Sequence, residues 1–277
     1  MINFNGQILD DSQVQFGTEN RAFKYGDAVF ESMKFSHGKI IFWEDHYFRL
    51  MSSMRILRME IPMNFSPEYL EEQIVETISA NHAEQNPSRV RLAAFRIGAG
   101  NYAPEQNEIS FVISVQPLAN DTFELNERGL KIDLFKDHYK QKSLLANLKT
   151  ANSLLYVLAG VFKTENNLDE CILLNDSKEV VESISANIFM VKGQVIFTPP
   201  ISSGCLKGVM RKNILKIAKN IGFEIREEAF SPFELQRADE VFLSNAIQGI
   251  RWVANYRKKE YTNEVAIQLS AALNSIV

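Results

Sequence analysis

Residues 143–162 constrain the fold of this chain more than any other stretch. They read SLLANLKTANSLLYVLAGVF, and Lys149 is the only charged side chain among them. About twenty apolar residues can cross a bilayer as a helix, so a membrane span is the first interpretation to weigh. The asparagines, serines and threonine of the stretch, together with a central lysine, make that placement costly. We therefore expect a loop followed by a helix buried within a globular protein.

Net charge, cysteine content and the N-terminal sequence narrow the class of protein. The chain has 277 residues, 45% of them hydrophobic and 23% charged, as is typical of folded domains. Its net charge of −4 does not indicate a nucleic-acid binder. The N-terminus lacks the basic and apolar regions of a signal peptide, and the cysteines, Cys171 and Cys205, predict neither a disulfide framework nor a metal site. We expect a cytoplasmic protein that holds no metal.

Strands and helices alternate along the chain in two series. Residues 29–43 predict a β-hairpin, residues 45–59 an amphipathic helix, and Ser66-Pro67 the start of another helix. Further strands are predicted at 89–95, 109–115, 130–135, 171–174, 187–191, 194–197 and 241–243, and a further helix at 209–221. The pattern breaks near residue 120. An α/β (α+β) fold with two domains, 1–120 and 121–277, follows.

Lys149 is the first candidate for chemistry. An amine that loses hydration on burial has a lowered pKa, and its neutral form is a nucleophile. The alternative is a helical lysine whose stem covers apolar surface while its ammonium reaches water. The uncharged surroundings of Lys149 favour the first interpretation more than they would for an arbitrary lysine.

Two turns could bind an anion. Residues 204–211, GCLKGVMR, form a glycine-containing turn that leads into a predicted helix, where backbone N–H groups and the helix dipole favour a phosphate. Residues 244–249, SNAIQG, form a second turn of small residues after a strand. Ordinary loops are the alternative for both turns.

Four charged side chains have open interpretations. Glu182 lies between apolar segments, so it is either solvated at a strand end or paired with a buried cation. Arg49 lies on the amphipathic helix, where a surface salt bridge is the default, although a guanidinium also suits phosphate. Arg91 and Arg96 belong to one strand and could bind a carboxylate or remain solvated at its edge.

Six motifs along the chain resemble, in order, those of the class IV aminotransferases. The motifs are FKYGDAVFESMKF, EDHYFRL, NLKTAN, ESISANIF, TPP followed by LKGVMR, and ADEVFLSNA. The resemblance extends over nearly the whole chain. It implies a homodimeric pyridoxal 5'-phosphate enzyme with a small N-terminal domain and a larger, cofactor-binding C-terminal domain. The expected substrates are amino acids and 2-oxo acids, with no nucleic acid or membrane as a partner.

The resemblance also implies roles for individual residues. Lys149 would form the Schiff base with the cofactor and move the α-proton, and Glu182 would keep the pyridine nitrogen protonated. Arg49 would bind the cofactor phosphate. Further phosphate contacts are implied for Val209, Met210, Ser244 and Asn245. Residues implied or considered for substrate binding are Tyr25, Phe30, Arg91 and Arg96.

The sequence departs from the transaminase pattern in the cofactor half. Met210 and Ala246 stand where transaminases of the family usually carry threonines, and Ser153 replaces a tyrosine of the branched-chain enzymes. These positions resemble aminodeoxychorismate lyases, whereas FESMK at residues 30–34 resembles transaminases. We expect amino transfer between a small, branched-chain-like amino acid and a 2-oxo acid. The alternatives are a lyase that releases pyruvate and 4-aminobenzoate, and a non-catalytic relative that acts as a binding module.

Overall fold

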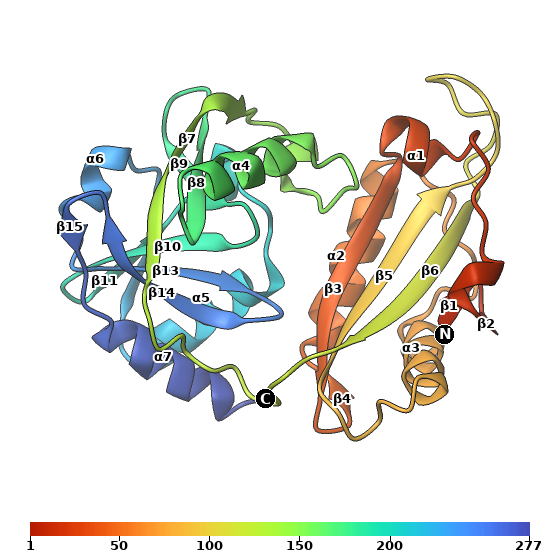
Figure 1. The fold of residues 1–277 in the computed structure, drawn as a ribbon, viewed down its shortest axis with the longest axis horizontal. Helices are drawn as coiled ribbons and strands as arrows, with labels where there is room; N and C mark the ends of the chain where they lie inside the picture. Colours follow the sequence, from red (N-terminus) through yellow and green to blue (C-terminus); the bar gives the residue numbers. More distant parts are fainter. The chain divides into compact units, whose positions relative to one another are not determined.

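The computed structural model describes residues 1–277, and the contacts within it divide the chain into two units (Figure 1). Unit 1 consists of Met1–Asp121 and Lys149–Asn152, and unit 2 consists of Thr122–Leu148 and Ser153–Val277. This division differs from the predicted domains 1–120 and 121–277 around Lys149, because that short segment packs with unit 1. Both units combine strands with helices, so the predicted α/β (α+β) class is confirmed.

Unit 1 is built on one antiparallel sheet of six strands in the order β2-β1-β6-β5-β3-β4. The strands are β1 (Ile2–Phe4), β2 (Gln7–Leu9), β3 (Ala28–Ser36), β4 (Lys39–Ile40), β5 (Ser88–Arg96) and β6 (Ile109–Pro117). The helical segments are η1 (Asp11–Gln13), α1 (Arg21–Tyr25), α2 (Trp43–Ile56) and α3 (Pro67–Ala80). Apolar side chains of α2, α3 and the sheet share one buried core.

The local chemistry explains the boundaries of these elements. His37 and Gly38 have φ values of 51° and 75°, the left-handed conformation that a two-residue hairpin turn requires. The hairpin is shorter than predicted, because Phe42 turns the chain at φ 57° and Trp43 already begins α2. The side chain of Ser66 accepts a hydrogen bond from the backbone N–H of Tyr69 and caps α3, as predicted.

Unit 2 is built on a nine-stranded sheet in which β9 pairs with both β8 and β10. Strands β10, β13, β14, β7, β8 and β9 therefore form a closed circuit around an apolar interior. The strands are β7 (Leu130–Lys140), β8 (Glu170–Asn175), β9 (Val180–Ser183), β10 (Asn187–Lys192), β11 (Val195–Thr198), β12 (Glu224–Glu227), β13 (Glu240–Asn245), β14 (Gly249–Tyr256) and β15 (Lys259–Glu260). The helical segments are η2 (Leu145–Asn147), α4 (Leu154–Glu165), η3 (Ile201–Ser203), α5 (Val209–Asn220), α6 (Pro232–Leu235) and α7 (Glu264–Asn274).

The prediction of one buried helix within residues 143–162 was wrong. The stretch contains the short helix η2, then the extended segment Lys149–Asn152, and α4 only from Leu154. The extended segment pairs with β3, since the Phe30 N–H donates to the Lys149 carbonyl at 2.9 Å and the Ala151 N–H donates to the Ala28 carbonyl at 2.9 Å. Much of the apolar surface of α4 is exposed. No helix is both long enough and apolar enough to span a membrane.

Candidate active site

Three polar side chains of unit 2 form a row across strands β9, β10 and β13. Asn187 is paired with Glu182 on one side and with Ser244 on the other. Residues directly opposite each other in antiparallel strands project to the same face of the sheet. With neighbouring strands about 4.8 Å apart, the row spans about 10 Å. All three residues are buried, so the row is a polar strip within the protein.

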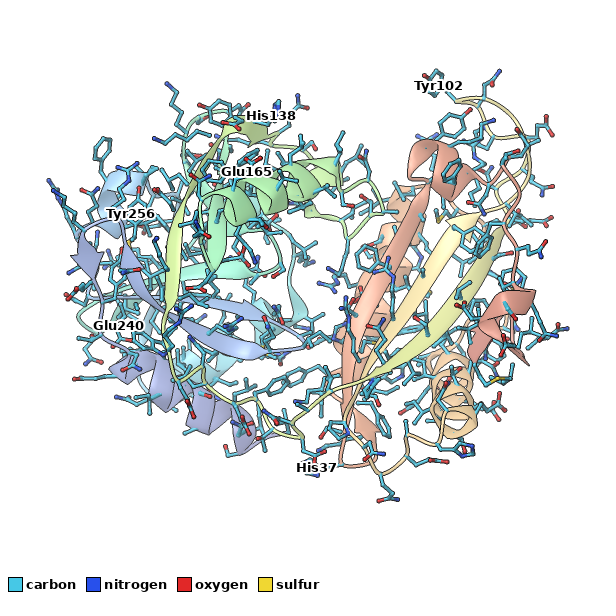
Figure 2. All side chains as sticks on the ribbon, in the orientation of Figure 1. His37, Tyr102, His138, Glu165, Glu240 and Tyr256 are labelled. Atoms are coloured by element: carbon cyan, nitrogen blue, oxygen red, sulfur yellow. The ribbon has the colours of Figure 1, made fainter.

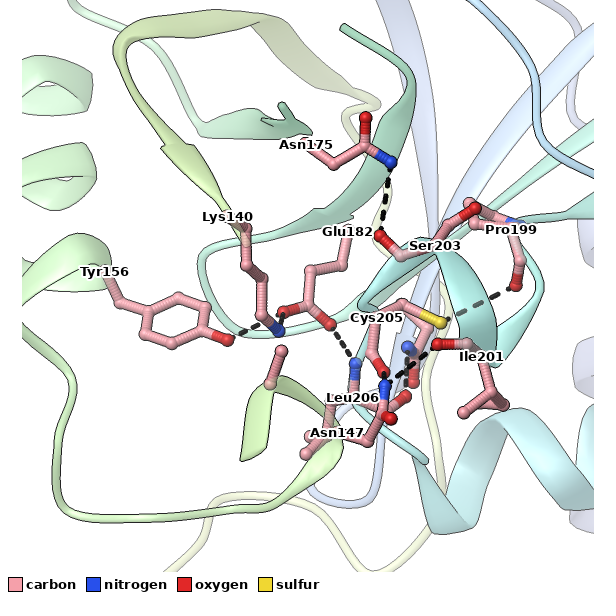
Figure 3. A network of polar contacts seen from close by, with 12 residues as sticks. Lys140, Asn147, Tyr156, Asn175, Glu182, Pro199, Ile201, Ser203, Cys205 and Leu206 are labelled. Carbon is pink, nitrogen blue, oxygen red and sulfur yellow. Dashed lines mark hydrogen bonds and ion pairs between the residues drawn. The ribbon is translucent and has the colours of Figure 1, made fainter. Parts of the chain in front are cut away.

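Glu182 accepts hydrogen bonds from three donors (Figure 3). The Lys140 ammonium and the Tyr156 hydroxyl donate to Oε1, the latter at 2.7 Å, and the Leu206 backbone N–H donates to Oε2 at 2.7 Å. Of the two interpretations that the sequence left open, the structure therefore shows pairing with a buried cation. Burial and the adjacent carboxylate raise the pKa of Tyr156, which therefore stays protonated and keeps donating to Glu182.

The N-terminus of α5 lies beside the middle of the row. Gly208 precedes the helix, and no side chain caps the N–H groups of its first turn, to which Val209 and Met210 belong. The Asn187 amide donates to the Leu206 carbonyl at 2.9 Å, and a Cβ added to Gly208 would come within 2.0 Å of Asn187 Oδ1. A glycine is therefore required here, and the helix start is held as a place for an anion.

Ser244 and Asn245 differ in their use of hydrogen-bonding groups. The Ser244 hydroxyl is buried and has no protein partner. The Asn245 side chain instead closes its own turn, since Oδ1 accepts the N–H groups of Ile247 at 3.0 Å and Gln248 at 2.8 Å. A buried hydroxyl without a partner carries a free-energy cost, which a bound ligand would remove. Ser244 is therefore the better placed of the two for a ligand.

In unit 1, two cations lie over one aromatic ring. The Lys149 amine is 4.6 Å from the centre of the Phe30 ring, and the Arg91 guanidinium carbon is 3.6 Å from it. Burial and the positive charge of Arg89 lower the pKa of Arg91. Because this cluster is rich in positive charge, it suits a carboxylate, and it includes three of the predicted residues, Lys149, Phe30 and Arg91.

Arg49 is buried rather than placed in a surface salt bridge. Its guanidinium contacts Glu31 through Nε, at 2.7 Å from Oε1, and through Nη2. His46 Nδ1 lies 2.7 Å from the same carboxylate. Burial raises the pKa of Glu31, but the charge of Arg49 and the hydrogen bonds outweigh burial and lower it to about 2. Burial lowers the pKa of His46, so the neutral ring donates its Nδ1 proton to Glu31.

Two other predicted residues of unit 1 have contacts outside this cluster. Arg96 is buried, and its guanidinium donates to Asp27, at 2.9 Å, and to the Leu57 carbonyl, at 2.6 Å, among other internal partners. These bonds use its donors to hold neighbouring loops, so we do not retain Arg96 as a substrate ligand. The Tyr25 ring packs against Tyr102, 5.5 Å away, in the exposed loop between β5 and β6 (Figure 2).

Comparison with known proteins identifies the family. The description "Amino-transferase class IV" matches residues 28–256, which is most of the chain and includes parts of both units. The chain belongs to the class IV aminotransferases. The members to which it is similar are enzymes that carry out amino transfer or a related lyase reaction.

Individual relatives within the class IV family cover most of the chain. A branched-chain-amino-acid aminotransferase of Escherichia coli K12 is 30% identical over 88% of this chain and 80% of its own length. An aminodeoxychorismate lyase of Vibrio harveyi is 25% identical over 91% and 90%. A solved branched-chain amino acid aminotransferase, from a source abbreviated T.th. and with pyridoxamine 5'-phosphate, has a TM-score of 0.88 at 24% identity and covers 99% of this chain and 93% of its own. This last likeness confirms the fold.

Sequence reasoning missed Lys140 and Tyr156 in this class IV aminotransferase. Tyr156 lies within the uncharged stretch, where its hydroxyl was a signal that a polar partner is needed. Lys140 is one of several lysines in its segment, and only the pairing of β7, β8 and β9 brings it to Glu182. The partnership of Arg49 with Glu31 was equally hidden, because it joins a helix to a strand.

Proposed function

We propose that this enzyme binds pyridoxal 5'-phosphate along the row of Glu182, Asn187 and Ser244. The chemistry of the row fits the two ends of that molecule. The unpartnered Ser244 hydroxyl and the uncapped start of α5 suit a phosphate. The Glu182 carboxylate, about 10 Å along the row, suits a protonated ring nitrogen. A crystal structure of a similar protein with pyridoxamine 5'-phosphate supports this choice of ligand.

The phosphate contacts proposed here depend on backbone groups and one hydroxyl. Backbone N–H groups of Val209 and Met210 would bind the phosphate, because neither side chain carries a donor. Ser244 would supply the hydroxyl that Met210 and Ala246 do not. Asn245 would contribute by fixing the turn. We also propose Arg49 as a phosphate ligand; its bonds to Glu31 hold one edge of the guanidinium in a fixed orientation.

Bound pyridoxal phosphate supplies an electron sink for the α-carbon of an amino acid. The Lys149 amine would bind the cofactor covalently and carry the α-proton as acid and base. Glu182 would hold the ring-nitrogen proton. Arg91 would bind the substrate carboxylate beside Lys149, with the Phe30 ring between them as an apolar wall. Tyr25 remains a proposed substrate contact on the resemblance alone.

We propose amino transfer between a small, branched-chain-like amino acid and a 2-oxo acid as the reaction. The observation that carries this proposal is the Lys149, Phe30 and Arg91 cluster, where an amine, an apolar ring and a carboxylate-binding group meet. The similarity to branched-chain enzymes supports it. The alternative, an aminodeoxychorismate lyase, is favoured by Met210 and Ala246 and by the lyase of Vibrio harveyi.

A substrate panel separates these reactions. The purified protein, reconstituted with pyridoxal phosphate, is given L-valine, L-leucine or L-isoleucine with 2-oxoglutarate, then D-alanine with 2-oxoglutarate, and aminodeoxychorismate alone. We expect glutamate to form from the branched-chain amino acids. Formation of 4-aminobenzoate and pyruvate without any amino transfer would replace this proposal with the lyase. A protein that takes up no cofactor would support the non-catalytic binding module.

We also propose that the enzyme is a homodimer and that α4 contributes to the contact between the copies. Leu154, Val157 and Val161 recur at helical spacing and are exposed, so they form an apolar face. We expect the wild type to sediment as a dimer, and Val157→Glu to weaken dimerisation about 100-fold or more, because a charge would be buried there. Glu165→Gln, on the same helix, is the control. A dimer unaffected by Val157→Glu would place the contact elsewhere.

A further inference from the structure

Two lysine–glutamate pairs lie close together in unit 2 and differ in their surroundings. Lys140 and Glu182 are buried, with side-chain exposures of 7% and 4%. Lys142 and Glu179, a few residues away, are 3.1 Å apart with exposures of 33% and 30%. The exposed pair is an ordinary surface salt bridge of small energetic value. The buried pair requires a different explanation, because removing two charges from water is costly.

Fold stability alone does not explain the buried pair. Buried ion pairs are often no more stabilising than apolar side chains of the same volume. Lys140 lies at the end of β7, and Glu182 occupies the row at the proposed cofactor site. The other titratable groups that face Glu182 are neutral: the pKa of Tyr156 is raised by burial, and burial raises the pKa of the Cys205 thiol to about 11. Lys140 is therefore the cation that balances the charge of Glu182.

The hydrogen bonds of Glu182 leave room for one more donor. An ionised carboxylate offers about four acceptor sites. Three are used, by Lys140, Tyr156 and the Leu206 N–H, and these donors reach the carboxylate through both of its oxygens. The three bonds fix the orientation of the carboxylate. The remaining site is available to a donor that comes from outside the protein.

We propose that Lys140 is a positioning residue that keeps Glu182 ionised and oriented toward the ring nitrogen of the cofactor. This inference rests on the proposed function. A carboxyl group in this buried place, without a neighbouring cation, would take up a proton more readily. A neutral carboxyl group binds a protonated ring nitrogen weakly, since the charge-assisted hydrogen bond is lost. With Lys140 present, the proton stays on the ring nitrogen and Glu182 accepts it in a hydrogen bond.

The test compares two cofactors in one variant. Apo-enzyme carrying Lys140→Met is titrated with pyridoxal phosphate and with its deaza analogue, in which carbon replaces the ring nitrogen. We expect the variant to bind pyridoxal phosphate about 10- to 100-fold more weakly than the wild type, as is typical when a supporting partner of a ligand is removed. Its affinity for the deaza analogue should be unchanged. Lys140→Arg should restore the affinity for pyridoxal phosphate.

The exposed pair provides the matched control. Lys142→Met removes a lysine of the same segment and should leave both affinities unchanged. In the holoenzyme, Lys140→Met should also shift the acidic limb of the rate profile to higher pH, because Glu182 would ionise later. If Lys140→Met does not fold, Lys140→Gln, which keeps a neutral N–H donor, replaces it with the same expected selectivity.

The possible outcomes separate the two levels of the proposal. Equal weakening of both cofactors would show that Lys140 only supports the fold, and equal retention of both would show that it has no role at the site. Either result would overturn the inference while leaving the cofactor proposal intact. A wild-type protein that binds neither compound would instead refute the proposed function.

Discussion

Replacing Lys149 with alanine is expected to reduce amino transfer by at least about 10⁴-fold and to abolish covalent attachment of the cofactor. General acid–base catalysis alone contributes about 10²- to 10⁴-fold, and the lost nucleophile adds to this. Rates are measured with the substrates identified by the panel, and attachment is measured by borohydride reduction followed by mass spectrometry. The fold should be retained, because the backbone bonds between this segment and β3 do not involve the Lys149 side chain.

Two further variants sharpen this prediction. Lys163→Ala changes a lysine near the end of α4 and should leave rate and attachment unchanged. Added methylamine should restore part of the activity of Lys149→Ala, since a small free amine can carry the α-proton. Borohydride labelling that persists in Lys149→Ala would assign the covalent role to a different lysine.

Glu31→Gln is expected to destabilise the protein by about 3–5 kcal/mol at neutral pH, because it leaves the Arg49 charge buried without its counterion. The same residue predicts a pH dependence. The pKa of Glu31 is about 2 in the folded protein and 4.5 ordinarily. Its contribution to stability, about 3 kcal/mol, is therefore complete above about pH 4.5 and is lost as the pH falls toward 2. Most of this loss should be visible by about pH 3.

Urea unfolding at about pH 6 and about pH 3 measures both effects. The wild type should lose more stability between these values than Glu31→Gln, in which the titrating group is absent. His46 acts in the same direction in both proteins, because its buried ring stays neutral while the unfolded ring takes up a proton. Glu72→Gln, on the exposed side of α3, is the control. An identical loss in the wild type and in Glu31→Gln would contradict the assignment.

The sequence was informative where a function depends on a short segment. The motif around Lys149, the turn at residues 204–211 and the carboxylate in ESISANIF could each be recognised locally. Most strands and helices could also be predicted, since their apolar periodicity reflects the core that they share. The closed circuit of unit 2 could not, because it depends on β9 pairing with two strands at once.

The environments of the charged groups were the least predictable part. Arg49 looked like a surface residue because its neighbours on the helix are polar, yet Glu31 on β3 holds it in the interior. Lys149 looked like part of a buried helix because its neighbours are uncharged, yet it lies in an extended segment beside β3. In both cases a strand that is distant in sequence supplies the partner, and no local pattern records that distance.

The pairing of β3 with residues 149–151 also affects how the protein is made. The chain leaves unit 1 after Asp121 and returns to it at Lys149. During synthesis the N-terminal end of β3 therefore has an unpaired edge until the ribosome has released this later segment. An exposed strand edge can pair with other chains, so nascent unit 1 is vulnerable to aggregation during that interval. Completion of the edge and delivery of the reactive lysine are the same event.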